Sequence, residues 1–149
     1  MGTVMQQPVA VQPGSGHKLP TLGVTHLLTS AQTGGAYYLC EAIFGPESGS
    51  PLHVHHHEDE VIYVLEGALD VRLDNDELHI PVGGVVHLPK KFPHALYNPL
   101  QTPLKIMVHA IPGGLEGYFD EVEAALQNDS LDQEMHSTIS TKYGLEWLE

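Results

Sequence analysis

The chain has 149 residues, with 19 Asp and Glu against 6 Lys and Arg, so its formal net charge is −13. This length is typical of one domain, and the acidic charge argues against nucleic acid or an anionic membrane as a partner. No apolar run is long enough to cross a bilayer, and the N-terminus lacks the basic and apolar regions of a signal peptide. The default expectation is therefore a cytoplasmic protein.

The first two thirds of the chain predict a short arm followed by strands. Residues 1–21 are rich in Pro, Gly and Gln and predict an irregular arm, within which residues 8–12 form a candidate edge strand. Residues 22–112 consist of short apolar or alternating runs bounded by turn residues, which is typical of strands. The expected strands are Val24–Thr29, Ala36–Phe44, Glu60–Leu65, Ala68–Leu73, Glu77–Ile80, Val85–Leu88, His94–Asn98 and Leu104–Ile111. Such a series without intervening helices predicts an all-β sandwich or barrel.

The spacing of apolar residues changes in residues 113–149. Apolar residues in the stretch Leu115–Leu126 recur at helical intervals, with acidic residues on the other side, and predict one helix. A second helix is predicted from Leu131 to Tyr143, with Ser130 as its N-cap and Gly144 as its C-cap. Both helices are expected to cover one outer face of the barrel.

The histidine-rich run from Pro51 to Glu60 is the most informative segment of the chain. Alternate residues of a strand point to the same face, so His53 and His55 would aim two imidazoles at one point. A strand that begins at Glu60 could return its carboxylate to that point, and His94 is a fourth candidate. Three imidazoles and one carboxylate suit iron, manganese, nickel, copper or zinc, and fit magnesium or calcium poorly.

These residues resemble the two sequence motifs of the cupin family. The motifs are matched, in chain order, by His53, His55, Glu60 and Gly67 and by Gly83, Pro89, His94 and Asn98. The departures are Glu47 and Lys91, which stand where the family usually has glycine. The amino-acid sequence around Glu60 is similar to that of quercetin 2,3-dioxygenase-like cupins.

The resemblance implies a cupin double-stranded β-helix, a jelly-roll barrel over residues 22–112 with C-terminal helices outside. It implies a metal held inside by His53, His55, Glu60 and His94, and a homodimer in which N-terminal strands are often added to the partner's sheet. In the resembled dioxygenases the glutamate takes a proton from a substrate hydroxyl, so Glu60 is also a candidate catalytic residue. A purely structural ligand is the alternative role for this residue.

The family alone leaves the activity open, because cupins include dioxygenases, isomerases, decarboxylases and binding proteins. The leading hypothesis is a metal-dependent dioxygenase acting on a small, largely apolar organic molecule, such as an aromatic or flavonol-like compound. The alternatives are a barrel that only binds a small ligand, and a metal-dependent isomerase or decarboxylase without redox chemistry.

The neighbours of the candidate ligands give weaker signals. His56 and His57 are expected on a solvent-facing loop, although histidine titrates near neutral pH and they could relay protons. Glu58 and Asp59 are interpreted as solvated acids of the turn. The only cysteine, Cys40, lies in a strand-like segment and is predicted to be a buried thiol.

Strand parity predicts which side chains share the inner face with the ligands. If Glu60 points inward, Ile62 and Val64 do so as well. The stretch Ala36–Phe44 presents two alternative faces, and the charged Glu41 favours its own face as the outer one. Two further residues, Phe92 and Met107, are candidates for the mouth of the pocket, although aromatic and Met residues in such segments are more often plain core.

Overall fold

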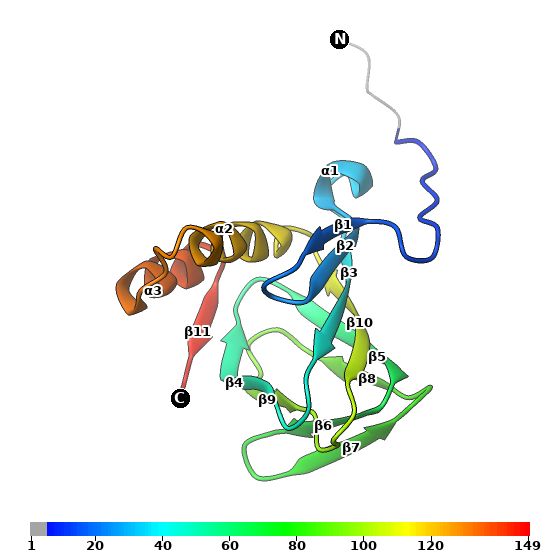
Figure 1. Ribbon diagram of the computed structural model, residues 1–149, viewed down its shortest axis with the longest axis vertical. Coiled ribbons are helices and arrows are strands. Elements are labelled where there is room, and N and C mark those ends of the chain that lie inside the picture. The colour runs from blue at the N-terminus through cyan, green and yellow to red at the C-terminus, as the bar shows by residue number, and fades with distance from the viewer. Residues whose placement is uncertain (1–5) are drawn as a thin grey trace.

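The computed structural model of the chain describes residues 6–149 and consists mainly of two facing antiparallel sheets (Figure 1). The first sheet has the order β1 (His17–Leu19), β2 (Val24–Leu28), β3 (Tyr38–Phe44), β10 (Leu104–Ile111), β5 (Asp59–Glu66), β8 (Val85–Leu88). The second has the order β11 (Leu145–Trp147), β4 (Gly49–His55), β9 (His94–Tyr97), β6 (Ala68–Arg72), β7 (Glu77–Pro81). The predicted all-β jelly roll is confirmed.

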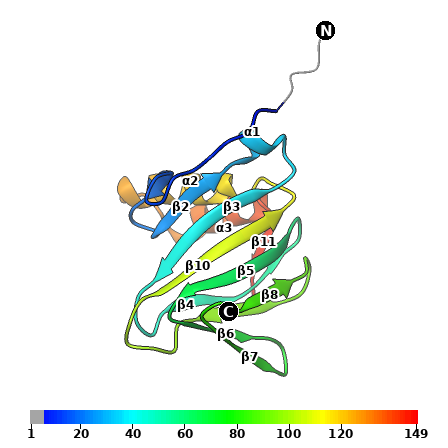
Figure 2. The same cartoon turned by 90° about the vertical axis from the view of Figure 1, so that its right-hand side faces the viewer.

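The core lies between the two sheets and follows from alternation along each strand. On β10 every second residue from Leu104 to Ala110 is buried, while the residues between them are only half-buried. The same parity buries Ile62 and Val64 on β5, as the sequence predicts. Figure 2 looks onto β3, β10, β5 and β8, which run side by side across the molecule. Antiparallel strands paired over most of their length, with one register shift between β10 and β5, therefore form one wall of the barrel.

In the described part of the chain, three helices accompany the sheets: α1 (Ser30–Thr33), α2 (Glu116–Gln127) and α3 (Gln133–Lys142). The longer two lie together at one end of the barrel, beside β11 (Figure 1). α2 buries Tyr118, Val122 and Ala125, because its apolar residues recur at helical spacing. None of the helices within residues 6–149 has the length and apolarity that a membrane span requires.

The caps of α3 differ from the sequence prediction. Its N-cap is Asp132, whose carboxylate accepts a hydrogen bond from the Met135 amide at 2.7 Å. Ser130 instead donates its hydroxyl to the carbonyl of Ala125, so it belongs to the end of α2. The C-cap is Tyr143, and Gly144 follows it in the left-handed conformation, with φ 72°. Asp and Ser are both good N-caps, so sequence preference alone does not separate these positions.

Two strands lie outside the range predicted for the barrel, and one predicted strand is absent. Residues 8–12 form no strand, whereas β1 follows them and pairs with β2. β11 arises from a tail with no strand signal and pairs with β4. The boundaries of the arm, barrel and helical segment remain predictions, as does the exchange of N-terminal strands in a homodimer.

Candidate metal centre

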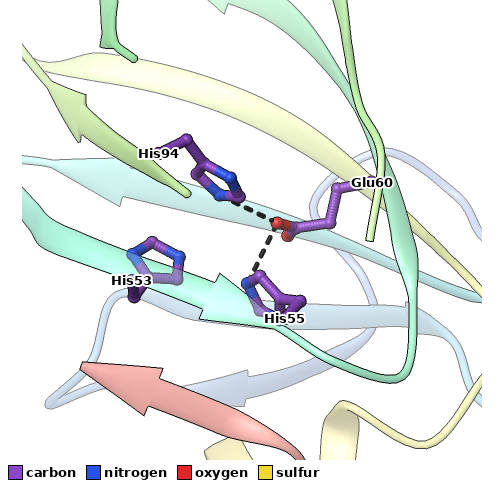
Figure 3. Close-up of side chains that lie close together, drawn as sticks. All are labelled: His53, His55, Glu60 and His94. Carbon is purple, nitrogen blue, oxygen red and sulfur yellow. Dashed lines mark ion pairs between the residues drawn. The ribbon is translucent and has the colours of Figure 1, made fainter. Parts of the chain in front are cut away.

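The structure brings all four predicted ligands together inside the barrel. His53 and His55 lie on β4, Glu60 on β5 and His94 on β9, and their ligand atoms lie within 4.8 Å of one another (Figure 3). All four side chains are buried, with exposed fractions of 2% to 6%. The centre therefore joins the two sheets, since β5 belongs to the first and the other two strands to the second.

Close approach of β4 and β9 places two of the ligands side by side. His53 and His94 are register partners across these strands. At the start of β4, a side chain at Gly49 would collide with the backbone of Leu96 and Tyr97, so only glycine allows this approach. Gly49 thus permits the close approach of the two strands that carry His53 and His94.

The inner atoms of the centre are short of hydrogen-bond partners. His55 Nε2 and His94 Nε2 lie 3.0 Å and 3.3 Å from Glu60 Oε1. Glu60 Oε1 and His94 Nε2 are nevertheless buried without a hydrogen bond of good geometry. Buried polar atoms are nearly always satisfied, and a cation between these groups would satisfy both. The donor set of three imidazoles and a carboxylate therefore fits a first-row transition metal.

The outer nitrogen of each imidazole has an acceptor. The Nδ1 atom of His53 lies 2.7 Å from the Pro51 carbonyl oxygen. That of His55 lies 2.9 Å from Glu58 Oε1, and that of His94 lies 3.3 Å from the Phe92 carbonyl oxygen. When Nδ1 donates to these acceptors, Nε2 is left free to act as a ligand. Metal-binding histidines almost always have such an outer partner, which fixes both tautomer and ring orientation.

The interpretation of Glu58 as a solvated acid was wrong. Its exposed fraction is only 3%, and its carboxylate holds the outer nitrogen of His55. The neighbouring Asp59 is half-buried and accepts a hydrogen bond from the Lys90 amide at 2.8 Å. Acidic residues in a turn are usually solvated, so only the folded turn reveals that Glu58 supports a ligand.

The pKa values of the ligands reflect their burial and mutual contacts. Burial, with smaller contributions from His94 and His55, lowers the pKa of His53 to about 4, so this imidazole is neutral. Burial also opposes protonation of His55, but Glu60 and Glu58 outweigh it and raise its pKa to about 10. Burial raises the pKa of Glu60, yet His55 and His94 outweigh it and hold this pKa well below its usual range. Glu60 is thus a carboxylate at neutral pH.

The two departures from the family motifs keep the backbone shape that glycine normally provides. Glu47 has φ 54° and Lys91 has φ 68°, both in the left-handed region that favours glycine. The Lys91 amide also donates to the carbonyl of His55 at 2.7 Å. The turn before His94 is thus tied to β4, and the substitution of glycine leaves the ligand in place.

A cavity of about 210 Å³ opens beside the ligands and has mainly apolar walls. From the first sheet it is lined by Val24, Cys40, Ala42, Ile106 and Val108. This resolves the orientation of β3, because Cys40 and Ala42 face inward and Glu41 faces outward, as its charge suggested. Cys40 is buried, as predicted.

The far side of the cavity is closed by residues for which the sequence gave no functional signal. They come from α2 with its N-cap residue and from β11, and are Leu115, Tyr118, Phe119, Leu145 and Trp147. Neither Phe92 nor Met107 lines the cavity, so their interpretation as mouth residues was wrong. His56 and His57 are exposed on the loop after β4, as predicted, and His56 pairs with Glu146 at 2.8 Å.

Comparison with known proteins agrees with this architecture. Residues 41–110 match the cupin domain family. The two facing antiparallel sheets and the buried group of three histidines and one glutamate agree with this match, so residues 41–110 contain a cupin domain.

Individual relatives are more distant. The chain is 36% identical over 74 residues to an uncharacterised protein of Methanocaldococcus jannaschii, covering 50% of this chain and 59% of that protein. It is 27% identical over 115 residues to quercetin 2,3-dioxygenase of Bacillus subtilis, covering 75% of this chain and 34% of the relative. The chain thus spans less than two thirds of either curated relative.

A similar solved structure is that of a predicted oxalate decarboxylase from Thermotoga maritima. The two chains are 26% identical with a TM-score of 0.55, over 60% of this chain and 78% of the other. This likeness supports the cupin fold.

Proposed function

We propose that this cupin is a metal-dependent dioxygenase that acts on a small, largely apolar organic molecule carrying adjacent oxygens on an aromatic ring. The observation that carries the proposal is the apolar cavity that ends on His53, His55 and Glu60, three members of the buried ligand group. The similarity to a quercetin 2,3-dioxygenase supports the same class of chemistry.

The four ligand residues would hold the metal, and the chain's other groups would position them. When bound, iron, manganese, nickel or copper would supply Lewis acidity and a place for substrate and O₂ to meet. Glu58 and the backbone acceptors hold the imidazoles in one orientation, so the centre is organised before any ligand arrives.

Glu60 has a second role in the proposal, as the acceptor of a proton. Its buried carboxylate lies on the cavity wall, where a substrate hydroxyl could reach it. Transfer of the hydroxyl proton to Glu60 leaves the substrate as an anion, which is the form that binds a cation best. The apolar walls exclude water and thereby strengthen the attraction between these charges.

A non-redox reaction is the second candidate, because a similar structure is that of a predicted oxalate decarboxylase. The lining of the cavity favours the first candidate. Most of its residues are aliphatic or aromatic, and no Lys or Arg lines it to bind a dicarboxylate. Zinc in the purified protein would favour the non-redox reaction, whereas iron, nickel, copper or manganese would favour the dioxygenase.

The test begins with elemental analysis of the purified protein. The metal-loaded protein is then incubated in air with a panel of catechols and flavonols, and O₂ uptake is recorded. We expect uptake with at least one compound, above that of a His53→Ala, His55→Ala double variant. If no compound gives uptake beyond this control, the dioxygenase proposal is rejected.

A further inference from the structure

The cavity at the metal centre is separated from a second hollow by a wall of three side chains. This outer groove, of about 740 Å³, lies between α3 and β11 and is lined by residues such as Gln133, His136 and Thr141. Tyr118, Leu145 and Trp147 line both the groove and the inner cavity. These three residues are therefore the partition between the metal centre and the exterior at this end of the barrel.

Trp147 has the largest side chain of the partition and lies directly against the metal centre. It is the register partner of His53, and the centroids of their rings are 4.9 Å apart. Its ring also lies 5.6 Å from that of His136, and its Nε1 donates to Ser140 Oγ at 3.0 Å. The indole is thus held in one orientation between a candidate ligand and the lining of the outer groove.

The strand that carries Trp147 is short and lies at the edge of its sheet. β11 has three residues and pairs with β4 alone. Its ion pairs are exposed, because Glu146 pairs with His56 and Glu149 with Arg72, whereas its other anchors are the buried Leu145 and the half-buried indole of Trp147. Exposed ion pairs contribute little to stability, so β11 can open at lower cost than the central strands.

We propose that ligands reach the metal centre from the outer groove past β11, and that Trp147 limits them to a single aromatic ring. The cavity of about 210 Å³ is smaller than the roughly 300–1,000 Å³ of most ligand pockets. On the basis of the proposed function, the substrate class is then a monocyclic aromatic diol, in place of a flavonol with several rings. Trp147 is then the residue that determines specificity.

The size limit can be tested without turnover, by using ligands that bind metals. Protein loaded with Co²⁺ is titrated with imidazole, which has one ring, and with 4-phenylimidazole, which has two, and the visible absorption of Co²⁺ reports binding. Trp147→Ala joins the two hollows, and Trp147→Phe keeps a smaller ring. Leu148→Ala is the matched control, because Leu148 is the next residue, is 45% exposed and lines neither hollow.

In the wild type and in Leu148→Ala we expect imidazole to bind at least tenfold more tightly than 4-phenylimidazole. In Trp147→Ala the two affinities become similar, and Trp147→Phe is intermediate. Equal affinities in the wild type, or an unchanged ratio in Trp147→Ala or Trp147→Phe protein that still melts cooperatively, overturn the inference. If the wild type prefers imidazole but no catechol gives O₂ uptake, the dioxygenase proposal is rejected and the size limit stands. If the protein does not bind Co²⁺, the metal centre on which both proposals depend is rejected.

Discussion

The barrel wall and the C-terminal cover contribute to the same cavity but are built in different ways. In the wall, β10 pairs along its whole length with β3 and β5, and its inward side chains are fully or almost fully buried. In the cover, a three-residue edge strand and the start of α2 complete the enclosure, and α3 packs against both from outside. Glu60 and Cys40 lie on the wall, whereas Trp147 lies on the cover. In our proposal the metal ligands are anchored on interior strands of the two sheets, and access is controlled by the short edge strand β11.

Hydrogen exchange tests directly whether the C-terminal cover is less stable than the barrel wall. Amides of β11 should exchange about 1,000-fold faster than the central amides of β10, because opening an edge strand requires less free energy than global unfolding. Mass spectrometry of peptides that cover residues 144–149 and 104–111 measures the difference. Equal protection of the two peptides would show that the cover is as stable as the wall.

Removal of two imidazoles should abolish metal binding while the barrel remains folded. We expect His53→Ala, His55→Ala protein to lose metal affinity by more than about 100-fold, because half of the ligand set is gone. Trp147 is the only tryptophan and lies 4.9 Å from His53, so quenching of its fluorescence by Cu²⁺ reports binding. His87→Ala, on the exposed side of β8, is the control and should quench like the wild type.

A smaller effect is expected when the support of one ligand is removed. Glu58→Ala should weaken metal binding by about 10–100-fold, because the outer nitrogen of His55 loses its buried acceptor. Glu58→Gln retains an oxygen acceptor and should recover part of the affinity. Metal competition titrations provide the measurement, with the exposed Glu66→Gln on β5 as the control. An affinity unchanged in Glu58→Ala would contradict this supporting role.

The smallest expected effect concerns the attachment of α2 and its dependence on pH. Glu116 accepts hydrogen bonds from the Ser30 amide at 2.7 Å and the Gly114 amide at 3.0 Å. Burial raises its pKa, but these hydrogen bonds outweigh burial and hold the pKa below the ordinary 4.5. A lowered pKa stabilises the fold at pH values above 4.5, and this contribution is lost as pH falls through the folded-state value.

Glu116→Gln should therefore cost about 1 kcal/mol at pH 7, equivalent to a Tm lower by about 2–4 °C. The difference from the wild type should shrink when the melts are repeated below pH 4. A difference in Tm that stays constant from pH 7 to pH 3 would show that ionisation of Glu116 plays no part.

Local sequence patterns were enough to predict the ligands of the centre and the inward-facing residues of most of the wall. His53 and His55 alternate on one strand, and Glu60 follows after a short turn, so local spacing was enough to group them. Alternation likewise indicated that Ile62 and Val64 face inward, because strand parity is a local property of the chain. The family motifs added His94 to this group.

The cover was decided only by the tertiary structure. β11 pairs with β4, some 90 residues away in the sequence. A three-residue strand is too short to show a periodicity that would predict such a pairing. Burial of Glu58 depends on how the turn folds over His55, and enclosure of the cavity depends on where α2 packs. Local spacing can identify which side chains share a face, whereas the space between distant segments exists only after they have packed together.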